Sequence, residues 1–128
     1  MRLLLDTHTY VWAIVQPERL SRQAHRLVSD PSNYLSLSIA SLWEATIKIA
    51  NGKMQVPGQS IAFFLQELAR FHIELLPIQP DHLRILETIP HLHKDPFDRI
   101  LLSQSIAEQM PLLSADATLR QYKAHILW

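Results

Sequence analysis

Short apolar runs alternate with longer segments of helical periodicity along the whole chain. Apolar runs at residues 3–5, 34–37, 111–114 and 126–128 predict strands, and a further strand is expected within residues 71–78. Between them, apolar residues three or four apart predict helices at 9–15, 21–29, 39–50, 59–70, 80–87 and 96–109, with a helical turn at 116–121. Short buried strands that alternate with helices predict an α/β fold with a parallel sheet covered on both faces.

Polar residues mark the ends of several of these helices. Ser21 and Ser38 stand where an N-cap is expected, and Asn51-Gly52 has the composition of a helix C-terminus. Residues 30–33 (Asp-Pro-Ser-Asn) predict a turn, and residues 90–95 predict a loop before the helix at 96–109. The chain shows no internal repeat, linker or low-complexity segment.

Length and charge narrow the class of protein. The 128 residues fit a single domain, 1–128, and 48% apolar with 19% charged residues is typical of a globular protein. Twelve Lys and Arg residues balance twelve Asp and Glu residues, which argues against a strongly electrostatic nucleic-acid binder. An enzyme that gathers its acids in a cleft and its bases around the rim stays compatible with a neutral total.

The absence of cysteine removes disulfides, thiol nucleophiles and thiolate zinc sites. An acid at position 6 interrupts the N-terminal apolar run too early for a signal peptide, and no apolar run has the length of a membrane span. We therefore expect a cytoplasmic protein without a membrane partner.

Four acids lie on separate predicted elements. Asp6 follows the first strand, and Asp116 follows the fourth strand, with Ala115 between it and Ser114. Sites in open parallel sheets form beyond the carboxyl ends of the strands. Asp98 opens the helix before the fourth strand, and Glu44 projects from the helix after the second. The four side chains are therefore expected to converge.

Carboxylates that converge repel one another and need a counter-ion. An all-oxygen donor set without cysteine favours Mg²⁺ or Mn²⁺ over zinc. Such an ion polarises a phosphodiester, generates a hydroxide nucleophile and stabilises the leaving oxygen. The acids therefore predict phosphodiester hydrolysis without a covalent nucleophile or organic cofactor.

Each acid also has an interpretation confined to structure. Asp6 and Asp116 are favoured N-caps, and Glu44 can pair with Lys48 at i, i+4 on a helix face. Asp95-Pro96 has the composition of a cap and a first-turn proline, and Asp98 suits the positive end of a helix. Taken one at a time capping is the more common role, and only the joint order of the acids favours a site.

That order resembles the PIN-domain family, most closely its VapC-type toxins of prokaryotic toxin–antitoxin modules. The matching stretches are residues 3–8 (LLLDTH), 38–44 (SIASLWE), 93–99 (HKDPFDR) and 113–116 (LSAD), together with Lys48 and Gly52-Lys53. They span residues 3–116, and the HKDPFDR run is the most distinctive of them.

The resemblance implies a three-layer α/β/α sandwich with a central parallel sheet, Mg²⁺- or Mn²⁺-dependent endoribonuclease activity, a homodimer and a cognate antitoxin. By position, Asp6, Glu44, Asp98 and Asp116 match the acidic quartet of the family. Asp6 and Asp98 are expected as direct metal ligands. Glu44 is expected to bind metal or orient water, and Asp116 to act directly or through water.

Neighbours of the quartet have assigned roles as well. Ser114 is expected to hold the carboxylate of Asp116, and Asp95 is interpreted as the cap of the helix that carries Asp98, although the two acids could exchange roles. Lys48 and Arg99 could contact the scissile phosphate, form salt bridges or neutralise the cluster.

Histidines and aromatic residues are given structural roles. His91 and His93 lie two apart in a loop without a third ligand in view, so zinc is disfavoured; His93 is expected to hydrogen-bond the loop and His8 to lie near the cleft. Aromatic residues are expected in the core or a dimer interface rather than against bases, and Trp128 is expected to pack. This group comprises Trp12, Trp43, Phe63, Phe64, Phe71 and Phe97.

Three other functions compete with a ribonuclease. A catalytically inactive PIN-like module would bind RNA or protein, but degenerate members should have lost some of the acids. A phosphoacceptor receiver domain needs an acid pair after the first strand and an acceptor Asp after a later one, and here the second predicted strand leads to Ser38. A DNA nuclease of the same fold needs substrate-guiding loops that a chain of 128 residues has little room for.

Overall fold

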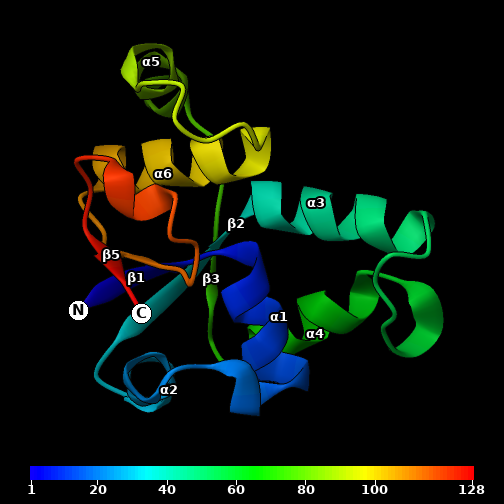
Figure 1. Cartoon of the computed structure of the whole chain (residues 1–128). Helices are drawn as coiled ribbons and strands as arrows, with labels where there is room; N and C mark the ends of the chain where they lie inside the picture. The colour runs from blue at the N-terminus through cyan, green and yellow to red at the C-terminus, as the bar shows by residue number, and fades with distance from the viewer.

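A computed structural model describes the whole chain, residues 1–128, and has a single five-stranded sheet at its centre (Figure 1). The strands run in the order β3-β2-β1-β4-β5, and every neighbouring pair is parallel. Their bounds are Arg2–Leu5 (β1), Tyr34–Ser38 (β2), Glu74–Leu76 (β3), Leu112–Leu113 (β4) and Ile126–Leu127 (β5). The expected parallel α/β sheet is confirmed, and β1 lies at its centre.

Helices cover both faces of the sheet, which gives three layers. The α-helices are Thr7–Val15 (α1), Arg22–Ser29 (α2), Ile39–Ala50 (α3), Ala62–Arg70 (α4), Pro80–Thr88 (α5) and Pro96–Glu108 (α6). Three 3-10 helices are Pro17–Arg19 (η1), Pro57–Gln59 (η2) and Leu119–Gln121 (η3). In Figure 1, α5 and α6 lie on one side of the strands, and α1, α2 and α4 lie on the other.

Two apolar cores follow from the alternation of side chains along the strands. Leu5 and Leu113 point to the core that contains Tyr10 and Phe64, whereas Leu4 and Leu112 point to the second core. Successive residues of a strand face opposite sides of a sheet, so a run of leucines fills both cores. The first core involves α1–α4, and the second involves α5, α6 and η3.

The helix starts follow the predicted caps closely. The side chains of Asp6, Ser21, Ser38 and Asp95 accept hydrogen bonds from backbone N–H groups of α1, α2, α3 and α6. At the other end of α3, Asn51 is the C-cap and Gly52 has a φ of 78°, the left-handed conformation that glycine adopts without strain.

Two predicted helical segments are shorter in the structure than the sequence indicates. The helix predicted at 59–70 begins at Ala62, because residues 57–59 form η2 and the Ser60 hydroxyl accepts the Ala62 N–H. Only residues 119–121 of the predicted turn at 116–121 are helical. Hydrogen bonds within two residues, which periodicity does not register, set both limits.

Helix α3 exposes much of its apolar stripe. Ala40, Leu42 and Ala45 are buried, whereas Ile39, Trp43 and Ile47 are exposed, Trp43 by 61%. Trp43 and Phe71, the latter 51% exposed, therefore lie outside the core, and their expected alternative place in a dimer interface stays a prediction.

None of the helices combines the length and apolar character that crossing a bilayer requires.

Candidate functional site

Asp6 lies directly after β1, at the carboxyl edge of the sheet, and is 4% exposed. Its Oδ1 accepts the Thr9 N–H at 2.8 Å, so the predicted cap is present, and its Oδ2 accepts a hydrogen bond from the Ser114 hydroxyl. The Thr9 hydroxyl donates to the Leu113 carbonyl at 2.8 Å, which fixes the start of α1 against β4. Asp6 is thus a cap whose carboxylate is also fixed at the edge of the sheet.

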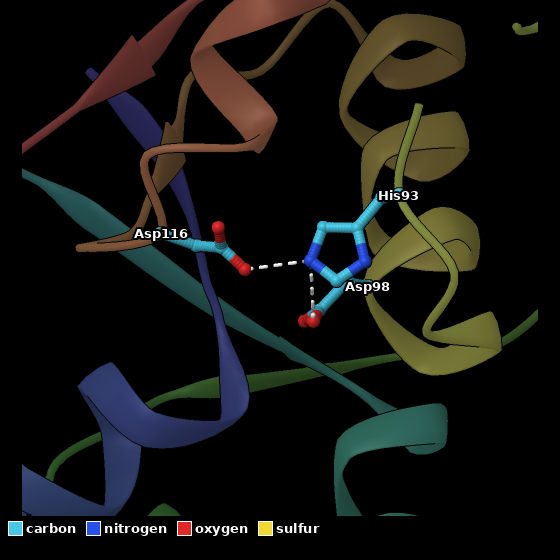
Figure 2. Close-up of side chains that lie close together, drawn as sticks. All are labelled: His93, Asp98 and Asp116. Carbon is cyan, nitrogen blue, oxygen red and sulfur yellow. Dashed lines mark hydrogen bonds and ion pairs between the residues drawn. The ribbon is translucent and has the colours of Figure 1, made fainter. Parts of the chain in front are cut away.

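His93 links two more of the predicted acids. Its Nε2 lies 2.6 Å from Asp116 Oδ2 and 3.2 Å from Asp98 Oδ2. Figure 2 shows one nitrogen of the imidazole facing both carboxylates, which come from the loop after β4 and the first turn of α6. One ligand atom of each residue lies within 4.8 Å of the others. Loop residue His93 therefore belongs to the cluster, which the sequence interpretation of this side chain missed.

Asp98 is the most strongly perturbed acid of the cluster. Burial, together with the negative charges of Asp95, Asp6 and Glu44, raises its pKa from 3.8 to about 7, and His93 opposes part of that rise. Because charges influence one another strongly only at short range, Asp6 and Glu44 are electrostatic neighbours of Asp98. This coupling joins acids from three separate elements in one cluster.

Asp116 is shifted in the opposite direction. Burial raises its pKa, but hydrogen bonds from His93 and from the Thr118 N–H outweigh burial and hold the pKa below its usual value. Asp98 and Asp116 flank the same imidazole, yet one favours the protonated form and the other the ionised form. Such a divergence between neighbouring carboxyl groups is common at functional sites.

Glu44 projects from α3 and is 5% exposed. Its Oε2 forms an ion pair with Lys48 Nζ at 2.9 Å, as the i, i+4 interpretation predicts. Its Oε1 is buried without any hydrogen-bond partner. An unpaired carboxylate oxygen in a buried position is unfavourable unless a cation or donor approaches it.

Ser114 and Arg99 depart from their predicted roles. The Ser114 hydroxyl donates to the carboxylate of Asp6 and accepts the backbone N–H of Asp116 at 3.1 Å, so the carboxylate that it holds belongs to the first acid. Arg99 is buried and donates to the Pro90 carbonyl at 2.8 Å, within 3.4 Å of the Tyr122 hydroxyl. It anchors the loop before α6 and makes no ion pair with the cluster.

Asp95 keeps the structural role that the sequence indicates. Its carboxylate accepts the Phe97 N–H at 2.8 Å and thereby caps α6, while its charge contributes to the raised pKa of Asp98. His8 and His91 make no ion pair with these acids. His8 is exposed and packs against Trp12 with ring centroids 5.8 Å apart, and exposed His91 lines a cavity that His93 and Arg99 also line.

The remaining aromatic residues mainly pack with one another. Trp128 contacts Trp12 at 5.9 Å between ring centroids, as predicted, and Phe63 packs on buried Phe64 at 5.3 Å. Trp43 and Phe97 meet edge to face at 5.1 Å, which joins α3 to the start of α6 beside the acids.

A groove of about 460 Å³ adjoins the acidic cluster. Glu44 and Asp95 line it, and so do the lysines at positions 48, 53 and 94. Lys48 is engaged by Glu44, whereas Lys53 and Lys94 are exposed and form no salt bridge. On this side of the cluster, two acids and three lysines therefore line one groove.

Chemically, the cluster offers hard oxygen donors. Asp6, Glu44, Asp98 and Asp116 are brought into one region by β1, α3, α6 and the loop after β4. The fit to a divalent cation such as Mg²⁺ or Mn²⁺ rests on two observations. Glu44 Oε1 is buried without a partner, and burial together with neighbouring carboxylates raises the pKa of Asp98 to about 7.

Comparison with protein families gives a match to the PIN domain over residues 3–124. Ribonuclease VapC22 of Mycobacterium tuberculosis is 25% identical over 122 residues, which cover 94% of this chain and 92% of that protein.

Solved structures share the fold. VapBC2 from Rickettsia felis, crystallised with a DNA fragment from its promoter, matches with a TM-score of 0.75 at 18% identity, over 100% of this chain and 98% of that chain. VapBC-1 from nontypeable Haemophilus influenzae matches with a TM-score of 0.67 at 16% identity, over 94% and 91%. The three-layer arrangement is therefore that of known proteins.

Proposed function

The chain belongs to the PIN-domain family, and from that premise we propose that it is a Mg²⁺- or Mn²⁺-dependent endoribonuclease and the toxin of a toxin–antitoxin pair. The observation that carries the proposal is the cluster of acids around Asp98, in which burial and neighbouring negative charges raise the pKa of Asp98 to about 7 and the buried Oε1 of Glu44 has no hydrogen-bond partner. The relative named a ribonuclease supports RNA as the substrate.

Asp6, Glu44, Asp98 and Asp116 would hold the divalent ion. When bound, the ion would polarise the phosphodiester and lower the pKa of water, so that hydrolysis needs no protein nucleophile. The Ser114 hydroxyl and the Thr9 N–H orient the carboxylate of Asp6. Lys48 orients Glu44 through Oε2, and the unpartnered Oε1 would be available to the ion.

The groove beside the cluster supplies contacts for the substrate backbone. Lys53 and Lys94 are exposed cations without acidic partners, and phosphate contacts of this type position a nucleic acid independently of its sequence. A neutral protein can thus bind RNA locally through a one-sided arrangement of charge. Lys48 is the groove lysine that pairs with an acid of the site, and we assign it the contact with the scissile phosphate.

Two protein partners are part of the proposal. Both solved relatives carry the name VapBC, which supports a cognate antitoxin for this chain. The exposed stripe of Ile39, Trp43 and Ile47 on α3 supports a homodimer, because a monomer rarely leaves such a run of large apolar side chains in water. Location in the cytoplasm stays a prediction.

The test is RNA cleavage by the purified protein. Labelled single-stranded and hairpin RNA of defined sequence, with total RNA as a broad substrate, should be cut in Mg²⁺ or Mn²⁺ and stay intact in EDTA. Asp6→Asn should abolish cleavage while circular dichroism shows a folded protein. Asp81→Asn, at an exposed acid of α5, is the matched control and should cleave at the wild-type rate.

Three results would contradict the proposal. Equal cleavage by wild type and Asp6→Asn would indicate a contaminating nuclease or a wrong site. Cleavage of DNA in preference to RNA would favour a DNA nuclease. Binding of Mn²⁺ without cleavage of any RNA would favour an inactive PIN-like module that binds RNA or protein.

A further inference from the structure

The proton of the His93 imidazole has a defined position in this fold. The backbone N–H of Asp95 donates to Nδ1 of His93 at 3.0 Å. A backbone N–H can only donate, so Nδ1 must present its lone pair. The neutral ring therefore carries its proton on Nε2, where both neighbours, Asp116 Oδ2 at 2.6 Å and Asp98 Oδ2 at 3.2 Å, are acceptors.

The loop that carries His93 is held independently of this ring. The backbone N–H groups of Leu92 and His93 donate to the Tyr122 hydroxyl at 3.0 and 2.8 Å, and that hydroxyl donates to the Pro90 carbonyl at 2.8 Å. Arg99 donates to the same carbonyl. These hydrogen bonds fix the backbone from which the imidazole projects, and the Asp95 N–H holds the ring itself through Nδ1.

A histidine that ligates a metal shows the opposite arrangement. One ring nitrogen binds the ion through its lone pair, and the other donates its proton to an oxygen acceptor. Here the nitrogen away from the acids meets a donor instead. Coordination through Nε2 would move the proton to Nδ1, where it would point at the Asp95 N–H and forfeit that hydrogen bond.

We infer, on the basis of the proposed function, that His93 does not coordinate the metal. It is a positioning residue whose Nε2–H donates to the carboxylate of Asp116 and fixes its orientation. Thr118 N–H holds Oδ1 of the same carboxylate at 2.8 Å, so both oxygens are oriented by the protein. The ion then meets only carboxylate oxygens, which favours Mg²⁺ and Mn²⁺ over metals that prefer nitrogen.

The first test locates the proton. Long-range ¹H–¹⁵N correlation spectra of wild-type protein at pH 8 are recorded without metal and with saturating Mg²⁺, and His93→Gln assigns the His93 signals. We expect a protonated Nε2 and an unprotonated Nδ1 in both spectra. A proton on Nδ1, or loss of the Nε2 proton when Mg²⁺ binds, would overturn the inference.

The second test separates hydrogen-bond donation from coordination. Mn²⁺ affinity is measured by calorimetry without RNA for wild type, His93→Gln and His93→Phe. His93→Phe keeps a flat ring without a donor and should weaken Mn²⁺ binding by roughly 10–100-fold, the usual effect of losing an outer partner. His93→Gln restores an N–H donor and should bind within a few-fold of wild type.

The outcomes differ from those that test the nuclease. A His93→Gln variant that binds Mn²⁺ as weakly as His93→Phe would show that the imidazole itself is required, and the inference would be wrong. Wild-type protein that binds Mn²⁺ with the proton on Nε2 but cuts no RNA would contradict the proposed function and leave the role of His93 intact.

Discussion

Asp98→Asn should make the metal-free protein more stable at pH 8, even though it removes a residue of the proposed site. Asp98 has a pKa raised to about 7, by burial and by the charges of Asp95, Asp6 and Glu44. At pH 8 its carboxylate is therefore ionised at an energetic cost in the folded protein. Asparagine has nearly the same shape and carries no charge, so the repulsion disappears.

The magnitude follows from proton linkage. The pKa of this carboxyl group rises from its ordinary 3.8 to about 7 on folding. Each unit of that rise lowers the free energy of unfolding at pH 8 by about 1.4 kcal/mol, so the whole rise gives an upper limit of about 4 kcal/mol. The side chain is 17% exposed, so screening by water reduces this value only in part. Below pH 3.8 the group is protonated in both states and contributes nothing, between pH 3.8 and 7 stability falls as pH rises, and above pH 7 the loss is complete.

The assay is urea unfolding in EDTA at several values between pH 5 and pH 8. The free energy of unfolding of wild type relative to Asp98→Asn should decline across this range by a few kcal/mol. Asp81→Asn, at an acid that is 77% exposed, is the control and should follow wild type. Mn²⁺ at 100 times its Kd should then stabilise wild type at pH 8 by about 2.7 kcal/mol and Asp98→Asn much less.

An Asp98→Asn variant that is no more stable than wild type at pH 8 in EDTA would refute this reasoning. So would a difference between the two proteins that does not change with pH. Either result would mean that Asp98 lies in an environment that compensates its charge, and the main argument for a cation at the cluster would fall.

Three further predictions concern the groove and the framework of the site. The double variant Lys53→Gln, Lys94→Gln should bind single-stranded RNA more weakly in EDTA, and the salt slope of its log Kd should fall by about 1.4. Lys123→Gln, beside the opposite edge of the sheet, should change neither quantity. Fluorescence anisotropy at several salt concentrations measures both. Arg99→Ala should lower the free energy of unfolding by about 2–4 kcal/mol, because the carbonyl of Pro90 loses a charged donor, and equal stability in urea unfolding would contradict its anchoring role. Tyr10→Phe should cost about 1–3 kcal/mol, since the buried hydroxyl donates to the Phe64 carbonyl at 2.7 Å; thermal unfolding that matches wild type would mean that water replaces this bond.

Interactions within a few residues explain why much of the fold follows from sequence. Asp6, Ser21 and Asp95 cap helices through N–H groups two or three positions ahead, so the residue type and its position are sufficient to predict them. The leucines of β1 and β4 fill both cores because side chains alternate along any strand. The order of the acids along the chain predicts the proposed site, and their role in it stays a prediction.

The tertiary structure decided the partners of these acids. Ser114 is separated from Asp6 by 108 positions and from Asp116 by two, and the sequence offers no measure of which carboxylate its hydroxyl reaches. Arg99 was considered for the substrate, and packing of the loop before α6 turned it to the Pro90 carbonyl instead. Exposure of Trp43 likewise depends on which face of α3 meets the sheet, and helical spacing alone leaves that choice open.

The sequence by itself thus determined the succession of strands and helices and the helix caps, because each depends on local periodicity or on side-chain chemistry. Only the tertiary structure placed His93 between Asp98 and Asp116, the latter 23 positions away, and fixed its proton through the Asp95 N–H. The physical reason is that a hydrogen bond selects its partner by distance and direction in space, and a folded chain sets both through contacts spread over its whole length.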